Sequence, residues 1–344
     1  MKITVAMRVI GGFAIITLLL LIISLSSLFN INSIGSSVDN LNDQAVPALN
    51  EVAAAKVDIL ELGSVQLETF YDEKVGEVDA HRKEFEASRS SLFSSLNELN
   101  RLIQGAGQGD RIDAIEKDSQ KYVDLIDRLF NQQREYLELQ TTTASQLDEI
   151  AFNIDDAAIM LLDTMDMSNN EVISREASNV ESSLSSLITL MYDLNKANKL
   201  DSAEVIRSEI DINIDSIRPR LEVLENEATG RTETMVSDAI TTVRNAIDSL
   251  QGNGSYPANV IRRQQLRVDA ENSLNSSQTQ LNKLMTETDE LQNAVRGIAE
   301  DTRVSVTDSI STSSWINSII TVVSIALAIL ISWYTVRSIS QPLS

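Results

Sequence analysis

Two long apolar runs stand near opposite ends of this sequence, and a polar, periodic stretch separates them. The first run, 9–29, and the second, 315–336, contain no charged residue. A helix that rises about 1.5 Å per residue needs roughly 20 residues to cross a hydrocarbon layer of about 30 Å, so each run is long enough. The sequence therefore predicts one transmembrane helix in each run.

A cleaved signal peptide is the alternative for the first run. Its apolar region would be shorter and would end in a site like Ala-x-Ala, whereas 25–30 has the sequence Leu-Ser-Ser-Leu-Phe-Asn. We therefore expect an uncleaved anchor. Lys2, Arg8 and Arg337 flank the two runs on their outer sides, so we expect both termini in the cytoplasm and 30–314 on the far side of the membrane.

Between the two runs, apolar residues recur three and four positions apart, which is typical of amphipathic helices. Four prolines and 12 glycines leave few breaks in this pattern. The breaks predict helices at 36–75, 78–103, 111–168, 171–197, 201–227 and 231–313, the last of them interrupted at Gly252–Pro257. Helices of these lengths let the chain run away from the membrane and back in six passes. We therefore expect an all-α fold in which two stacked four-helix bundles share two long helices.

Composition narrows the possible functions. The chain has a formal net charge of −22, which argues against a nucleic acid or an anionic lipid surface as partner. It has no cysteine and one histidine, His81, so thiolate metal ligands and the common nucleophile–base pairs find no support in the sequence. We expect no enzymatic activity, no cofactor and no metal site.

Cations interrupt the apolar stripes of the predicted first bundle. Helix 78–103 carries Arg82 and Arg89 between apolar neighbours, and helix 36–75 carries a stripe made of Leu49, Ala53, Lys56, Leu60, Gly63, Leu67 and Phe70. A bundle interior tolerates a cation only when the cation is paired or reaches water. Estimated helix lengths place Lys56, Arg89, Tyr122 and Thr288 in one layer. The sequence thus predicts a site for a carboxylate there, with Arg82 nearer the helix end.

For each cation there is also an interpretation that involves no ligand. A long basic side chain on a bundle seam can extend outward to water or pair with a carboxylate such as Glu61 or Asp124. Three further cations, Arg262, Arg263 and Arg267, follow the Gly252–Pro257 break. They could line a second site, but a solvated basic face is the simpler interpretation.

An all-α domain of this design between two spans resembles the helical bimodular sensor domain of bacterial methyl-accepting chemotaxis receptors. The ending Arg337-x-Ile339-x-x-Pro342-Leu343 resembles the start of a HAMP linker in 337–344, with the output part expected beyond Ser344. The resemblance implies an inner-membrane receptor that binds a small organic acid or other small anion in the periplasm, as a homodimer with the last helix as its expected seam. It would pass a displacement of that helix to the HAMP domain and then to cytoplasmic kinase partners.

In four-helix-bundle members of that family, cations on the first helix and a threonine on the last contribute to ligand binding. Lys56 and Thr288 occupy similar kinds of position. Three alternatives remain open: the input region of a sensor histidine kinase, a receptor for a periplasmic binding protein, and a structural coiled-coil membrane protein that senses nothing.

Overall fold

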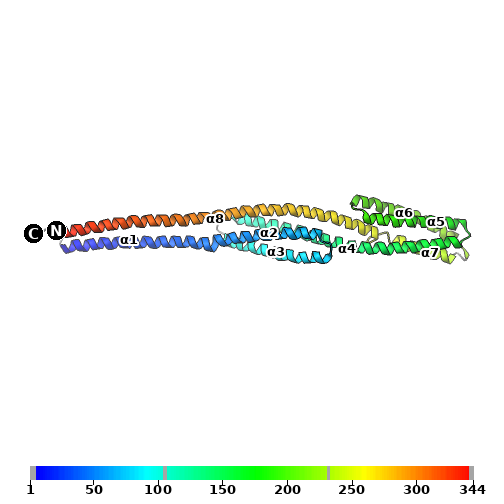
Figure 1. Ribbon diagram of the computed structural model, residues 1–344, viewed down its shortest axis with the longest axis horizontal. Helices are drawn as coiled ribbons and strands as arrows, with labels where there is room; N and C mark the ends of the chain where they lie inside the picture. The colour runs from blue at the N-terminus through cyan, green and yellow to red at the C-terminus, as the bar shows by residue number, and fades with distance from the viewer. Residues whose placement is uncertain (1–4, 104–106, 231–232, 341–344) are drawn as a thin grey trace. The chain divides into compact units, whose positions relative to one another are not determined.

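The computed structural model describes residues 5–103, 107–230 and 233–340. Every regular element in these ranges is helical (Figure 1), which confirms the predicted all-α fold. In chain order the elements are α1 (Val5–Asn40), the π-helical turn η1 (Leu41–Ala45), α2 (Val46–Tyr71), α3 (Val75–Leu102), α4 (Gly109–Met167), α5 (Glu171–Lys196), α6 (Leu200–Glu227), α7 (Glu233–Asp248) and α8 (Tyr256–Ser340).

Most helix ends coincide with the predicted breaks, because those breaks hold residues that stop or start helices. The side chain of Asn170 caps α5 by accepting a 2.9 Å hydrogen bond from the backbone N–H of Val172. Gly252 and Gly254 adopt positive φ angles of 88° and 85° in the loop before α8. Pro257 then stands in the first turn of α8, where its missing N–H costs nothing. Part of the predicted break before α4, residues 104–106, lies outside the described residues.

The predicted start of a separate helix near Ser36 is wrong. The chain remains helical from α1 through η1 into α2, because no proline occurs before Pro47. In η1 the backbone N–H of Val46 bonds to the carbonyl of Leu41, five residues earlier. This wider turn accommodates one extra residue without ending the helix.

The chain divides into two compact units. Unit 1 contains the residues up to Ile59, then Ser90–Asp118 and the chain from Lys283 on, so parts of α2, α3, α4 and α8 form its bundle. Its core is apolar on each of these helices: Ala48, Val52, Ala55, Ile59, Leu92, Leu96, Leu99, Ile112, Ile115, Leu284, Leu291 and Val295 are buried.

Unit 1 also holds both candidate membrane spans. By length and composition, the apolar runs in α1 and α8 are each long enough to cross a membrane. The two runs lie side by side: a Cβ placed on Gly12 would lie 2.6 Å from Ile331 Cγ2, so glycine permits close approach there. Further along, the Ser27 hydroxyl donates to Asn317 Oδ1 at 3.4 Å.

Unit 2 comprises Leu60–Arg89 and Ser119–Asn282. One large apolar core joins the second half of α4 to α5, α6, α7 and the start of α8, and it includes Leu161, Leu187, Ile214, Val243 and Val260. We call it the distal core. Figure 1 shows α5 and α6 packed as a hairpin, in agreement with their contacts. Elsewhere in unit 2, Leu62, Phe85, Tyr122 and Phe130 are buried between α2, α3 and α4.

The predicted core stripe of α2 is partly wrong. Leu60 is 55% exposed and Leu67 is 43% exposed, although the spacing predicts both inside. Phe70 is buried as predicted, and the other buried positions include Ala48, Val52, Ala55, Ile59, Leu62, Gln66 and Thr69. The helix is therefore apolar on two faces, and one of them packs within the chain.

Candidate functional site

Two of the predicted ligand-binding residues lie in unit 1. The ammonium group of Lys56 on α2 forms an ion pair with Asp289 on α8. Thr288, the neighbour of Asp289, is buried, and its hydroxyl finds no hydrogen-bond partner among the described residues. Lys56 therefore pairs with a carboxylate, as one of the alternative interpretations predicts. Its partner is Asp289 rather than Glu61 or Asp124.

The other three predicted residues lie in unit 2. Arg82 pairs with Asp127 at 3.4 Å and stacks on the ring of Phe130 at 5.5 Å. Arg89 pairs with Glu86 of its own helix at 3.2 Å. Tyr122 is fully buried, and its hydroxyl lies 2.7 Å from Gln66 Oε1 and 3.1 Å from the carbonyl of Leu62. Burial raises the pKa of Tyr122 far above its usual range.

Each predicted cation is therefore already neutralised by a carboxylate. An anion binding to Lys56, Arg82 or Arg89 would have to displace Asp289, Asp127 or Glu86. The joint anion site of Lys56, Arg89, Tyr122 and Thr288 stays a prediction.

A second feature of unit 1 is an acidic pair that shares one cation. Lys283 on α8 forms ion pairs with Asp118 on α4 and with Glu287 one turn further along α8, the latter at 3.4 Å. Asp118 is buried and Glu287 is half-buried. Burial raises the pKa of Glu287, and Asp118 adds to this rise, while Lys283 opposes it. The Glu287 carboxylate is therefore more costly to ionise here than in water.

Unit 2 contains a polar cavity of about 480 Å³ at the turn between α2 and α3. Its lining combines aromatic, amide and charged side chains: Phe70, Tyr71, Asp72, Glu73, Gln133, Tyr136, Leu137, Gln140 and Arg267. The guanidinium of Arg267 lies over the ring of Phe70, 4.2 Å from its centroid. Arg267 Nε lies 3.5 Å from Glu271 Oε1 one turn further along α8, so the two terminal nitrogens are the part of the guanidinium that a ligand carboxylate could bind. We call this cavity the turn cavity.

The wall of the turn cavity is built from buried polar groups. The Gln133 amide donates to the carbonyl of Asp72 at 2.8 Å, while its own oxygen, Oε1, has no partner in the described chain. The Asp72 carboxylate lies 3.0 Å from His81 Nδ1. Burial raises the pKa of Asp72 even though His81 opposes the rise.

Two other cavities offer no cation. A cavity of about 270 Å³ in unit 1 is lined by amide, hydroxyl and apolar side chains around Gln44 and Val295. A groove of about 500 Å³ between α5 and α6 is lined mainly by serines, with Glu209 as its charged residue. Arg267 therefore distinguishes the turn cavity from these two as a place for a small anion.

The three arginines after the Gly252–Pro257 break differ, so a uniformly solvated basic face is a wrong description. Arg262 is exposed and makes a two-pronged ion pair with Glu135. Arg263 is buried and donates to Thr143 Oγ1 at 2.8 Å and to the carbonyl of Asn195 at 3.3 Å. Its role is to fasten the start of α8 to α4 and α5. Arg267 also has a carboxylate partner, Glu271 at 3.5 Å, but it is the one of the three that lines a cavity.

Comparisons with known proteins agree with a sensory role. Residues 2–136 match the family described as a four helix bundle sensory module for signal transduction. The crystal structure of the TorS sensor domain–TorT complex in the presence of TMAO is similar over 72% of this chain and 99% of that chain, with a TM-score of 0.58 and 9% identity.

A second solved structure, the sensor domain of the V. parahaemolyticus histidine kinase sensor TorS, covers 74% of this chain and 99% of its own, with a TM-score of 0.44 and 12% identity. No curated protein matches the chain. The predicted resemblance to a helical sensory module is thereby confirmed, and the two candidate spans fit a membrane receptor. Over residues 2–136 this chain matches a four-helix-bundle sensory module, and most of the chain has the fold of a sensor domain.

Proposed function

We propose that this chain is the sensory part of a two-pass chemoreceptor that binds a small organic anion in the periplasm and performs no catalysis. The observation that carries the proposal is α8, which runs unbroken from Tyr256 to Ser340 and includes Arg267 of the turn cavity, Asp289 beside Lys56 and the second candidate span. A ligand that contacts such a helix can alter a structure on the other side of a membrane.

We place the anion in the turn cavity, on Arg267. The terminal nitrogens of this guanidinium would bind the carboxylate in competition with Glu271, which lies 3.5 Å from Nε. The volume, about 480 Å³, suits a small metabolite. Lys56 and Arg89, with Tyr122 and Thr288, remain the rival site.

Transmission would use a small change in α8 rather than a large rearrangement. A ligand can shift a two-state equilibrium only as far as its affinities for the two states differ. Displacements of about 1–2 Å are common for helices in such transitions. The HAMP linker would begin at Arg337 and receive this displacement on the cytoplasmic side; its Pro342 and Leu343 lie outside the described residues.

A homodimer is also part of the proposal, and an exposed stripe on α2 supports it. Val46, Val57, Leu60, Leu67 and Tyr71 are apolar or aromatic, each at least 43% exposed. The four from Val57 on follow the alternating three and four spacing of a coiled-coil seam, with Ser64 in the remaining position. We therefore place the dimer seam on α2, in preference to the last helix.

The second candidate is a receptor that binds a periplasmic protein rather than a free metabolite. The solved sensor domain with a similar fold was crystallised with a protein, TorT. The ion pairs of Lys56, Arg82 and Arg89 favour this candidate, because they leave fewer free cations for an anion.

The test uses the full chain in lipid nanodiscs. Because the chain has no cysteine, Ser27→Cys and Asn317→Cys place a single crosslinkable pair between the two spans. Organic acids are first screened by thermal shift, since a ligand at 100 times its dissociation constant stabilises the fold by about 2.7 kcal/mol. We expect a carboxylate that raises the melting temperature also to change the crosslinking rate.

Variants then separate the candidate sites. Arg267→Ala should abolish both responses, and Arg262→Ala, an exposed ion-paired arginine five residues away, should leave both unchanged. Loss of response in Lys56→Ala and Arg89→Ala, but not in Arg267→Ala, would move the site to the rival position. If neither an organic acid nor a periplasmic extract changes the crosslinking rate, the chain is not a receptor of the proposed kind.

A further inference from the structure

The single histidine of the chain lies between carboxylates on two helices. His81 on α3 places Nδ1 3.0 Å from Asp72 Oδ2 and Nε2 3.3 Å from Glu68 Oε2. Asp72 is almost fully buried, whereas the Glu68 side chain is 53% exposed. One side of the imidazole therefore faces the interior, and the other side faces solvent.

The buried carboxylate favours one tautomer of the ring. In the tautomer whose Nδ1–H donates to Asp72, Nε2 carries its lone pair toward Glu68. Two acceptors that face each other at 3.3 Å need a proton or a cation between them. A carboxylate behind a histidine in this way is the usual outer partner of a metal-bound imidazole, because it orients the ring and makes it more basic.

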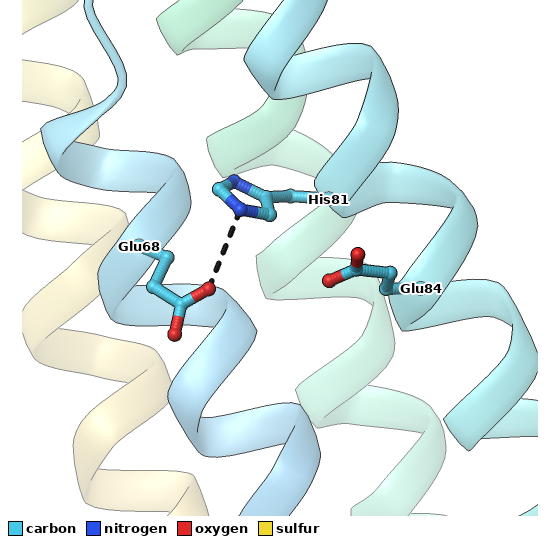
Figure 2. Close-up of side chains that lie close together, drawn as sticks. All are labelled: Glu68, His81 and Glu84. Carbon is cyan, nitrogen blue, oxygen red and sulfur yellow. Dashed lines mark ion pairs between the residues drawn. The ribbon is translucent and has the colours of Figure 1, made fainter.

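A third ligand completes the group on the same side. Glu84 follows His81 by three residues, so both side chains project from one face of α3. One ligand atom from each of Glu68, His81 and Glu84 lies within 4.8 Å of the others. Figure 2 shows Glu68 on one helix and His81 and Glu84 on the next, with the three side chains directed toward one another. A single proton can join only two of these groups, but a metal ion can join all three.

The separation of two of the three ligands suits zinc in particular. Zinc binds imidazole nitrogen and carboxylate oxygen at about 2.0–2.2 Å in a tetrahedron, whose edges are then about 3.3–3.6 Å. The separation of His81 Nε2 from Glu68 Oε2, 3.3 Å, matches such an edge. Glu84 is exposed and can move closer through side-chain rotation alone. An imidazole ligand disfavours calcium and magnesium, which prefer oxygen ligands.

We propose that Glu68, His81 and Glu84 form a Zn²⁺ site, oriented by Asp72, with a fourth position open to water or an external ligand. The site joins α2 to α3 on either side of their short connection, so bound zinc would hold these two helices together. The proposal rests on this geometry alone, and it does not depend on an anion binding in the turn cavity.

The experiment titrates Zn²⁺ into the full chain, solubilised in detergent and stripped with EDTA, by isothermal calorimetry. Co²⁺ is used in parallel, because its visible absorption reports tetrahedral nitrogen and oxygen ligands directly. We expect one ion per chain, at least tenfold weaker binding in Glu68→Gln and in Glu84→Gln, and no Co²⁺ absorption in His81→Ala. Asp72→Asn should weaken binding by about 10–100-fold.

Glu86→Gln is the matched control, since Glu86 is an exposed glutamate on α3 that pairs with Arg89. It should bind zinc like the parent chain. The two glutamine variants retain shape and fold, so the test stands even if His81→Ala unfolds. The proposal is wrong if the parent chain binds no zinc. It is equally wrong if Glu68→Gln, Glu84→Gln and Glu86→Gln all bind zinc with parental affinity.

Discussion

Two partly buried glutamates, one in each unit, have opposite electrostatic environments. Glu176 on α5 in unit 2 lies 3.0 Å from Arg175 and 2.9 Å from Arg220, and these hydrogen bonds lower its pKa. Glu287 on α8 in unit 1 shares Lys283 with Asp118, and its pKa is raised by burial.

The balance between burial and neighbouring charge explains the difference. Two guanidiniums more than compensate for the partial burial of Glu176, whereas burial of Glu287, with the charge of Asp118, outweighs the Lys283 ammonium. Glu176, beside the distal core, is stabilised in its ionised form. Glu287, inside unit 1, is destabilised in its ionised form. Regions of the second kind are where a proton or a ligand can change a packing equilibrium.

The largest effect should come from the distal core. Leu187 is fully buried on α5, so Leu187→Ala should destabilise the chain by about 2–5 kcal/mol through lost burial and a new cavity. Val205→Ala, at a 59% exposed position on α6, is the control and should cost well below about 1 kcal/mol. Urea unfolding followed by circular dichroism measures both. Equal costs would contradict the prediction.

A medium effect should separate two buried tyrosines. Tyr122→Phe removes the hydroxyl that donates a hydrogen bond to Oε1 of the buried Gln66. We expect this to lower the free energy of unfolding by about 1–3 kcal/mol. The hydroxyl of Tyr256 in the distal core donates to the carbonyl of Met191 in α5. A carbonyl inside a helix also accepts a backbone hydrogen bond, so Tyr256→Phe should cost less, about 0.5–1.5 kcal/mol. The same urea titrations measure both changes. A larger loss in Tyr256→Phe would reverse the comparison.

The smallest effects should differ in sign. A raised carboxyl pKa stabilises the fold below the unfolded pKa, and this contribution is lost as pH rises through the folded pKa. Glu287→Gln should therefore stabilise the chain at pH 7, by up to about 1 kcal/mol, and have little effect near pH 4. A lowered pKa acts in the opposite direction, so Glu176→Gln should destabilise the chain at pH 7, and its effect should fade as pH drops below the unfolded pKa.

Melting temperatures from pH 4 to pH 7 test this pair. The prediction fails if the two variants shift stability in the same direction at pH 7.

The sequence predicts the helices well because their ends are chemically marked. Asn170, Gly252, Gly254 and Pro257 stop or start helices by local geometry, which needs no knowledge of the fold. The start of the first helix is predicted wrongly for the same reason, since 30–46 contains no strong breaker and the helix simply continues.

The choice between two apolar faces needs more than spacing. On α2, Leu60 and Leu67 are larger than Ala48 and Ala55, so a sequence pattern favours them as core. The folded chain buries Ile59 and Leu62 along with these alanines, so side-chain size does not decide which face packs within the chain. Spacing alone can identify both stripes, but not which one faces the chain's own helices.

The candidate sites are the hardest part to predict. The pattern of cations points to Lys56 and Arg89, but it cannot show that Asp289 and Glu86 neutralise them. The groups around Asp72 come from residues on both sides of a turn and from distant parts of α4 and α8. Only the short sequence distance between Glu68 and His81, across one connection, hints that these side chains can meet.

The π-helical turn at Leu41–Ala45 sets the rotational phase between the first candidate span and α2. A residue added to a continuous helix turns everything beyond it by about 100° and shifts it by about 1.5 Å, unless a wider turn absorbs it. In η1 the extra residue is absorbed, so the face of α1 that meets Ile331 and the face of α2 that packs in unit 1 are both satisfied. Deleting one residue here would therefore leave a regular α-helix with the two faces still aligned, whereas inserting one without a further wide turn would rotate α2 against α1 by about 100°.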